Sequence, residues 1–90
     1  MLTAIGSDPS AFDGKYISFR LSDEQTKSGK TQIWEVTAKT DGFNLGQVRW
    51  FGRWRKYSFF PASNCVFEET CLGDITEFIK WATHSHKHGV

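Results

Sequence analysis

The fold of this chain is decided by the stretch Val48-Arg49-Trp50-Phe51-Gly52-Arg53-Trp54-Arg55-Lys56-Tyr57, which interleaves four cations with four aromatic rings. Its first half alternates apolar and polar residues, as a half-buried strand does, and Gly52-Arg53 permits a reversal into a second strand. No Asp or Glu occurs between Asp41 and Glu68, although the net charge of the whole chain is only +1. Charge is therefore segregated along the sequence, which is typical of an anion-binding surface.

Period-two alternation predicts further strands on both sides of this hairpin. The predicted strands occupy residues 16–21, 32–39, 45–51 and 54–60, and residues 65–67 are a candidate for a short edge strand. Val48 and Trp50 are expected to face the core, which leaves Arg49 on the outer face. The register of the strand pair decides whether Arg55 and Tyr57 lie beside Arg49.

The apolar spacing becomes helical from Thr70, which is expected to be the N-cap. One stripe of the predicted helix, about three to four turns long, contains Leu72, Ile75, Phe78, Ile79 and Ala82. This stripe can be buried only against the apolar face of the strands. The predicted fold class is α+β, an antiparallel β-meander of four to five strands packed on one C-terminal α-helix.

The length of 90 residues is sufficient for one domain. Residues 1–14 are expected to be an irregular lead-in, residues 15–83 the single α+β domain, and residues 84–90 a flexible His-containing tail. The chain shows neither a signal-peptide pattern nor a run long enough to span a bilayer, so a cytoplasmic protein without membrane contact is expected. Cys65 and Cys71 are then expected to stay reduced.

His84, His86 and His88 stand at alternate positions and would face one side of an extended chain, where they could hold a divalent metal together with the cysteines. The Cys65-x5-Cys71 spacing is not that of a zinc knuckle, so no metal is expected. The serines and cysteines lie in no nucleophile motif, and the glycines form no phosphate loop. The chain is therefore expected to be neither an enzyme nor a cofactor carrier.

The candidate ligand-binding residues all come from the decisive stretch: Arg49, Phe51, Arg53, Trp54, Arg55, Lys56 and Tyr57. Its four cations would neutralise phosphates, since a guanidinium presents planar paired donors. A ring of Trp54, Tyr57 or Phe51 would stack on a base. In the alternative interpretation the cations only solvate the open side of the sheet, or the patch contacts a protein.

The wider pattern adds a resemblance. The spacings Trp34-x-Val36, Leu45-Gly46-x-Val48-x-Trp50-x3-Trp54-Arg55-x-Tyr57-x-Phe59-x-Pro61, Val66-Phe67 and Cys71-Leu72-x-Asp74-Ile75-x2-Phe78-Ile79 resemble a group of small uncharacterised proteins of bacteria and their phages. The resemblance covers about half the chain and brings no established activity with it. It implies a context in which small proteins often act by binding, and several families of comparable size capture host signalling nucleotides.

The leading hypothesis is a non-catalytic binding protein of phage or mobile-element type. Its hairpin, or a pocket between copies in a homo-oligomer, would capture a phosphate-bearing nucleotide such as a host defence signalling nucleotide. One alternative is a protein that binds single-stranded or double-stranded nucleic acid with the same residues. Another alternative is a protein-binding inhibitor of a host factor that uses Trp and Arg as hot spots.

Overall fold

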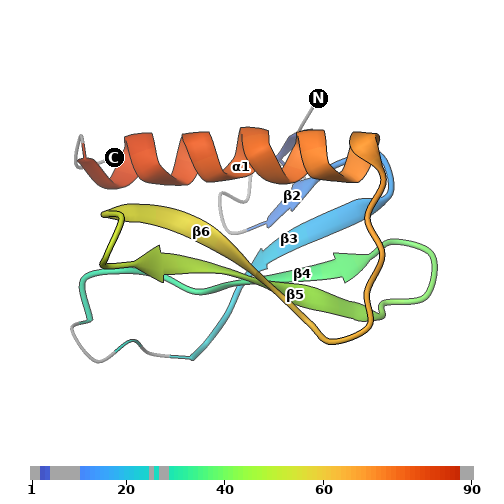
Figure 1. Ribbon diagram of the computed structural model, residues 1–90, viewed down its shortest axis with the longest axis horizontal. Helices are drawn as coiled ribbons and strands as arrows, with labels where there is room; N and C mark the ends of the chain where they lie inside the picture. Colours follow the sequence, from blue (N-terminus) through green and yellow to red (C-terminus); the bar gives the residue numbers. More distant parts are fainter. Residues whose placement is uncertain (1–2, 5–10, 25, 27–28, 88–90) are drawn as a thin grey trace.

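The computed structural model describes residues 3–4, 11–24, 26 and 29–87. Figure 1 shows two layers, with one long helix lying over one face of a twisted sheet. In chain order the strands are β1 (Thr3–Ala4), β2 (Ala11–Asp13), β3 (Ile17–Leu21), β4 (Trp34–Ala38), β5 (Asn44–Phe51) and β6 (Lys56–Pro61), and helix α1 is Glu69–Lys87. The predicted α+β fold class is confirmed.

The sheet is a meander, because every strand pairs with its neighbours in the sequence. The order is β1-β2-β3-β4-β5-β6, and each pair is antiparallel. The described residues thus form six strands, where the sequence indicated four to five. The strand β6 is one edge of the sheet, and α1 lies beside it through a bond from the Tyr57 N–H to Thr83 Oγ1 at 3.1 Å.

The expectation of an irregular lead-in over residues 1–14 needs correction, since β1 and β2 lie within it. Three residues of β2 pair with β3, and Ser18 Oγ donates to Asp13 Oδ1 at 2.7 Å across this pair. The Phe12 ring reaches the helix, with its centroid 5.5 Å from that of Phe78. Strands this short show too few alternations for a period-two pattern to be detected.

The core lies between α1 and the facing side of the sheet. Its buried members from the strands include Ile17, Phe19, Trp34, Val36 and Val48. From the helix, the ring of Phe78 stacks on Phe19 with centroids 4.3 Å apart and planes 5° apart. The inward faces predicted for the second and third predicted strands are therefore confirmed.

The chain between β6 and α1 runs around the end of the sheet (Figure 1). Residues 65–67 form no strand there, so the candidate edge strand is absent from the described residues. The helix is capped by Glu68 and not by Thr70, because the two carboxylate oxygens of Glu68 accept the N–H groups of Thr70 at 3.0 Å and Cys71 at 2.7 Å. A carboxylate here also complements the positive end of the helix dipole.

The helix is longer than predicted, with 19 residues or about five turns. Residues 84–87 belong to it, which corrects the predicted flexible tail for these residues, while His88 lies outside the described residues. The last turn is held by His86, whose ring centroid lies 4.6 Å from that of Trp50. One member of the predicted stripe is misplaced, because Leu72 is 48% exposed.

The helix offers a matched pair of substitutions for the core. Ile75 is 4% exposed and Leu72 is 48% exposed, although the two side chains are isomers on the same helix. Ile75→Ala should lower the free energy of unfolding by about 2–5 kcal/mol, whereas Leu72→Ala should change it by less than about 1 kcal/mol. Urea denaturation measures both. Equal losses would contradict the packing described.

The capping carboxylate predicts a pH dependence. The pKa of Glu68 is lowered from its usual value of 4.5, mainly by the hydrogen bond from the Thr70 backbone amide and next by the one from Cys71. The ionised carboxylate therefore stabilises the fold above pH 4.5, and this contribution is lost as the pH falls through the lowered folded-state pKa. Glu68→Gln should reduce the urea midpoint at neutral pH and not at about pH 2. Glu69→Gln is the control, and an identical pH profile for both variants would refute the capping role.

Candidate anion-binding surface

The hairpin that carries the predicted site residues has a tip of four residues, 52–55. The last strand pair is Phe51 with Lys56, and the tip is closed by a bond from the Arg55 N–H to the Gly52 carbonyl at 3.3 Å. Arg55 adopts a φ of 53°. Trp54 and Arg55 therefore belong to the turn and not to the strand predicted over residues 54–60.

A glycine sets how closely the two strands of this hairpin approach. Gly46 has a φ of 144°, and a Cβ added there would overlap the Phe60 carbonyl oxygen and lie 2.9 Å from Pro61 Cα. Only glycine fits this backbone and this spacing. Gly46 thus permits the close approach of β5 and β6 at the end opposite to the tip.

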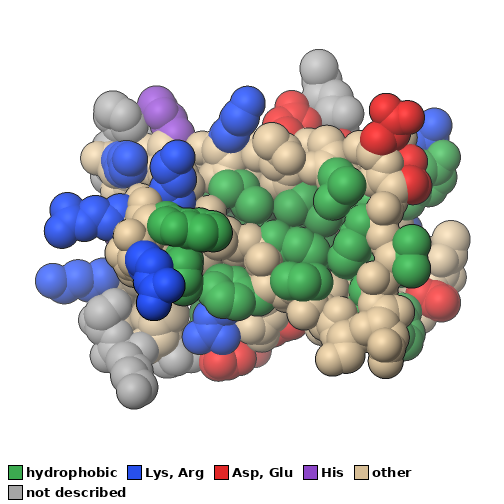
Figure 2. Space-filling view, in the orientation of Figure 1, with side chains coloured by type: hydrophobic (Ala, Val, Ile, Leu, Met, Phe, Trp, Pro, Cys, Tyr) green, Lys and Arg blue, Asp and Glu red, His purple; other side chains and the backbone are tan. Residues whose placement is uncertain are grey.

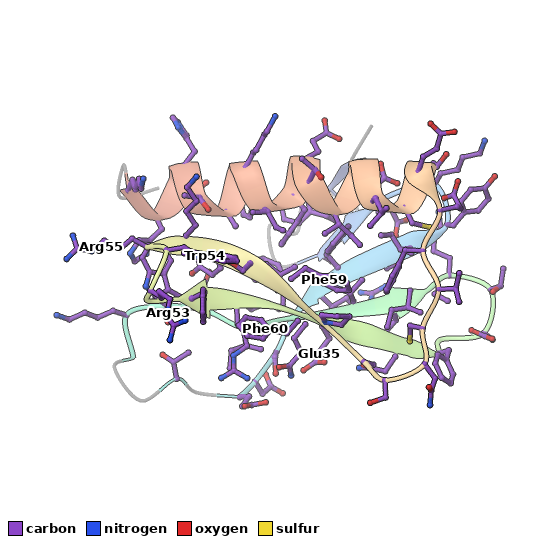
Figure 3. The ribbon with its side chains drawn as sticks, in the orientation of Figure 1. Glu35, Arg53, Trp54, Arg55, Phe59 and Phe60 are labelled. Atoms are coloured by element: carbon purple, nitrogen blue, oxygen red, sulfur yellow. The ribbon has the colours of Figure 1, made fainter. Side chains whose placement is uncertain are left out.

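Arg49 lies on the face of the sheet away from α1, here called the open face, as predicted. Its Nη1 donates to Gln47 Oε1 at 3.2 Å, and Gln47 Nε2 in turn donates to Glu35 Oε2 at 3.0 Å. The guanidinium carbon lies 5.7 Å from the centroid of the Phe60 ring. Figure 3 shows Phe60 and Glu35 on this open face and Phe59 on the side of α1. Arg49 is thus held in a polar chain that ends in an acid, which weakens its positive field.

The hairpin tip presents the most exposed part of the predicted site. Trp54 is 65% exposed, and its ring centroid lies 4.9 Å from that of Phe51 in an edge contact. The Arg53 guanidinium lies 5.9 Å from the Phe51 ring. Both arginines project from the tip, and Arg55 points away from the body of the molecule (Figure 3). A flat ring and two cations are therefore available to one ligand.

Tyr57 is misplaced in the predicted site, because it lies in the core on the opposite face from Arg49. It is 4% exposed, and its hydroxyl accepts the Gln32 N–H at 3.0 Å. The register pairs Tyr57 with Trp50, an inward residue, and pairs Arg49 with Ser58. The four-residue tip determines this register, and the number of turn residues could not be read from the sequence.

The helix adds cations that the sequence interpretation missed. A groove of about 480 Å³ between β6 and α1, here called the basic groove, is lined by Lys56 from the hairpin and by Lys80, His84 and Lys87 from the helix. Its remaining lining residues are Ile79 and two threonines, Thr76 and Thr83. The sequence did indicate this grouping, because Lys80, His84 and Lys87 are spaced by four and three residues and so share one face of a helix.

Charge is segregated in space as well as along the sequence. Figure 2 shows cations gathered at the end of the molecule that carries the hairpin tip and the last turns of α1, and acidic side chains around the start of α1. The described residues that line the basic groove include no acid. An anion approaching the basic groove therefore meets a predominantly positive field.

The described residues contain no group of three or more His, Cys, Asp or Glu placed to hold a metal ion. His84 and His86 are separated by the helical turn, which places their rings on different sides of α1. Within the described part of the chain, no helix is long and apolar enough to cross a bilayer.

Sequence comparison finds a relative in a phage. Over 58 residues the chain is 36% identical to a protein of Acholeplasma phage L2 that is described as an uncharacterized 9.3 kDa protein. The match covers 64% of this chain and 74% of the phage protein. No family model and no solved structure matches the chain. The comparison thus supplies a biological source for a relative and no activity.

The hairpin tip predicts opposite effects of glycine at two neighbouring arginines. Arg55 has a φ of 53°, whereas Arg53 is not among the residues with positive φ. Arg55→Gly should raise the free energy of unfolding by up to about 1 kcal/mol, because glycine adopts this backbone without steric cost. Arg53→Gly should lower it, since glycine only adds freedom to the unfolded chain. Urea denaturation of both variants decides, and equal changes would argue against strain at Arg55.

Proposed function

Because the chain belongs to the family of the 9.3 kDa protein of Acholeplasma phage L2, we propose that it is a phage-type protein that binds a phosphate-bearing ligand without catalysis. The ligand class that the geometry favours is single-stranded nucleic acid. A single nucleotide, which carries the same phosphate and base, is the smaller alternative ligand. The binding surface is the basic groove together with the hairpin tip.

One observation carries this proposal. Lys56 lines the basic groove and follows directly after the tip residues Arg53, Trp54 and Arg55 in the sequence. The groove and the tip are therefore neighbours, with cations from two elements, and Figure 3 shows the exposed Trp54 between Arg53 and α1. Lysines and arginines neutralise successive phosphates, while Trp54 offers a face on which any base can stack.

The spread of the cations favours a strand over a single nucleotide. A mononucleotide presents one phosphate group, which one or two cations satisfy. This surface presents three lysines, a histidine and two arginines, and the arginines lie on a protruding turn. Small ligands are usually held in concave sites that bury most of their surface. A flexible strand can instead follow the groove and then reach the tip.

The absence of catalysis is part of the proposal. The thiol of Cys71 lies in the first turn of α1, and burial raises its pKa, with further raising by Glu68. A thiol with a raised pKa carries little thiolate at neutral pH. Towards the other end of α1, His84 lines the basic groove together with the lysines, whereas the ring of His86 packs against Trp50.

Binding to a fluorescein-labelled single strand of about 12 nucleotides, a length within the usual site sizes, tests the proposal by anisotropy. Lys80→Gln and Arg55→Gln should each weaken binding and should each lower the salt dependence by about one counterion. Arg20→Gln is the matched control, because Arg20 is an exposed arginine that stands opposite Glu35 in the neighbouring strand.

Three outcomes would change the proposal. Equal weakening by all three substitutions would indicate nonspecific attraction to net charge. Binding of mononucleotides with a shallow salt slope, but not of the strand, would restore the nucleotide hypothesis. No binding of either ligand at submillimolar concentration would leave the protein-binding inhibitor as the function to pursue.

A further inference from the structure

A second cavity lies on the side of the sheet that faces α1. It has a volume of about 410 Å³ and is formed between residues 29–32, which precede β4, and the last turns of α1. Three aromatic residues, Trp34, Tyr57 and Trp81, form much of its lining, so it is called the aromatic cavity here. It shares no lining residue with the basic groove. Its volume falls within the range of small-molecule sites.

Trp34 gives this cavity an unusual property. The residue is 2% exposed, and among the described residues its Nε1 is the buried side-chain nitrogen or oxygen that has no hydrogen-bond partner. A buried donor without an acceptor destabilises the fold, so native structures satisfy nearly all such groups. Trp34 lines the aromatic cavity. Because neighbouring side chains cover Nε1, an acceptor atom held in the cavity would satisfy this N–H after a small shift of a lining side chain.

The other polar residues of the cavity are also donors. The Tyr57 hydroxyl already accepts the Gln32 N–H at 3.0 Å, so its own proton remains to be donated. Ser85 is buried and adds a second hydroxyl. Lys30 supplies a positive charge, the His86 ring adds a nitrogen that can donate, and the described lining residues include no acid. Aromatic walls, several donors and net positive charge together fit an anion that carries a flat ring.

We propose that the aromatic cavity binds a small aromatic or heterocyclic anion. Its carboxylate or phosphate oxygens accept hydrogen bonds from Trp34 and the hydroxyls, and its ring lies against the exposed side of Trp81. The ammonium group of Lys30 neutralises its charge, and the His86 ring offers a further hydrogen bond. This site is separate from the surface proposed for nucleic acid and does not depend on it.

The test follows the indole N–H signals of the four tryptophans in ¹H–¹⁵N correlation spectra of the full chain. The probes are benzoate, uridine monophosphate, inorganic phosphate and uridine, each at up to about 1 mM, which detects weak sites. Benzoate, uridine monophosphate or both should move the Trp34 indole proton downfield, and benzoate should leave that of Trp54, at the hairpin tip, unmoved. Which of the two binds distinguishes a carboxylate from a phosphate ligand. Inorganic phosphate and uridine, which lack the ring or the charge, should have weaker effects.

Two matched lysine substitutions separate this site from the nucleic-acid surface. Lys30→Gln should weaken the Trp34 response about tenfold, the effect of one charge-assisted bond, and leave oligonucleotide binding intact. Lys80→Gln should do the reverse. No probe moving the Trp34 signal, or a Trp34 response that Lys80→Gln weakens as much as Lys30→Gln, would overturn the proposal, whatever the oligonucleotide result.

Discussion

The stacking of Phe78 on Phe19 is the contact on which the rest of the structure depends. A single helix over a one-sided sheet has no second helix to hold its position, so ring contacts must determine it. Phe78 also makes edge contacts with Phe12 at 5.5 Å and Trp34 at 5.0 Å, and so meets three strands at once. Edge-to-face and offset stacked pairs add specific geometry to the area that they bury. With the middle of α1 held in this way, its last turns lie beside β6, where they form one wall of both cavities.

The same packing explains which parts of the fold could be predicted. Alternation along a strand reports which residues face the core, so Val48 and Trp50 were placed inward and Arg49 outward from the sequence. Register decides which residues are neighbours across strands, and it depends on the turn geometry as well as on the alternation. Tyr57 was misplaced for this reason, because a turn that is one residue longer or shorter reverses the face of every residue in β6. The contribution of Phe12 was missed because three residues of β2 are too few to show a period.

The candidate site also has a part that the sequence indicated and a part that only the structure shows. Arg53, Trp54 and Arg55 were identified from composition alone, because a short exposed turn leaves its side chains on the surface whatever the register. The weakening of Arg49 by Gln47 and Glu35 depends on the register of β4 and β5, which places Glu35 opposite Gln47. The lysines of α1 were readable from helical spacing, yet only the docked helix shows that they share a groove with Lys56. The unpaired N–H of Trp34 is a property of packing and has no signature in the sequence.

The consecutive strand order has a consequence for the kinetics of folding. Each strand pairs with the next one along the chain, so the hairpins close over local connections, of which the one between β3 and β4, residues 22–33, is the longest. Contacts between chain ends are the exception, as in the bond from the Lys15 N–H to Asp74 Oδ2, which joins residues 59 positions apart. The sheet can thus form by local steps, and the docking of α1 is the step that must overcome a large chain entropy. Such a topology belongs with the faster-folding arrangements available to a protein built largely from β-strands.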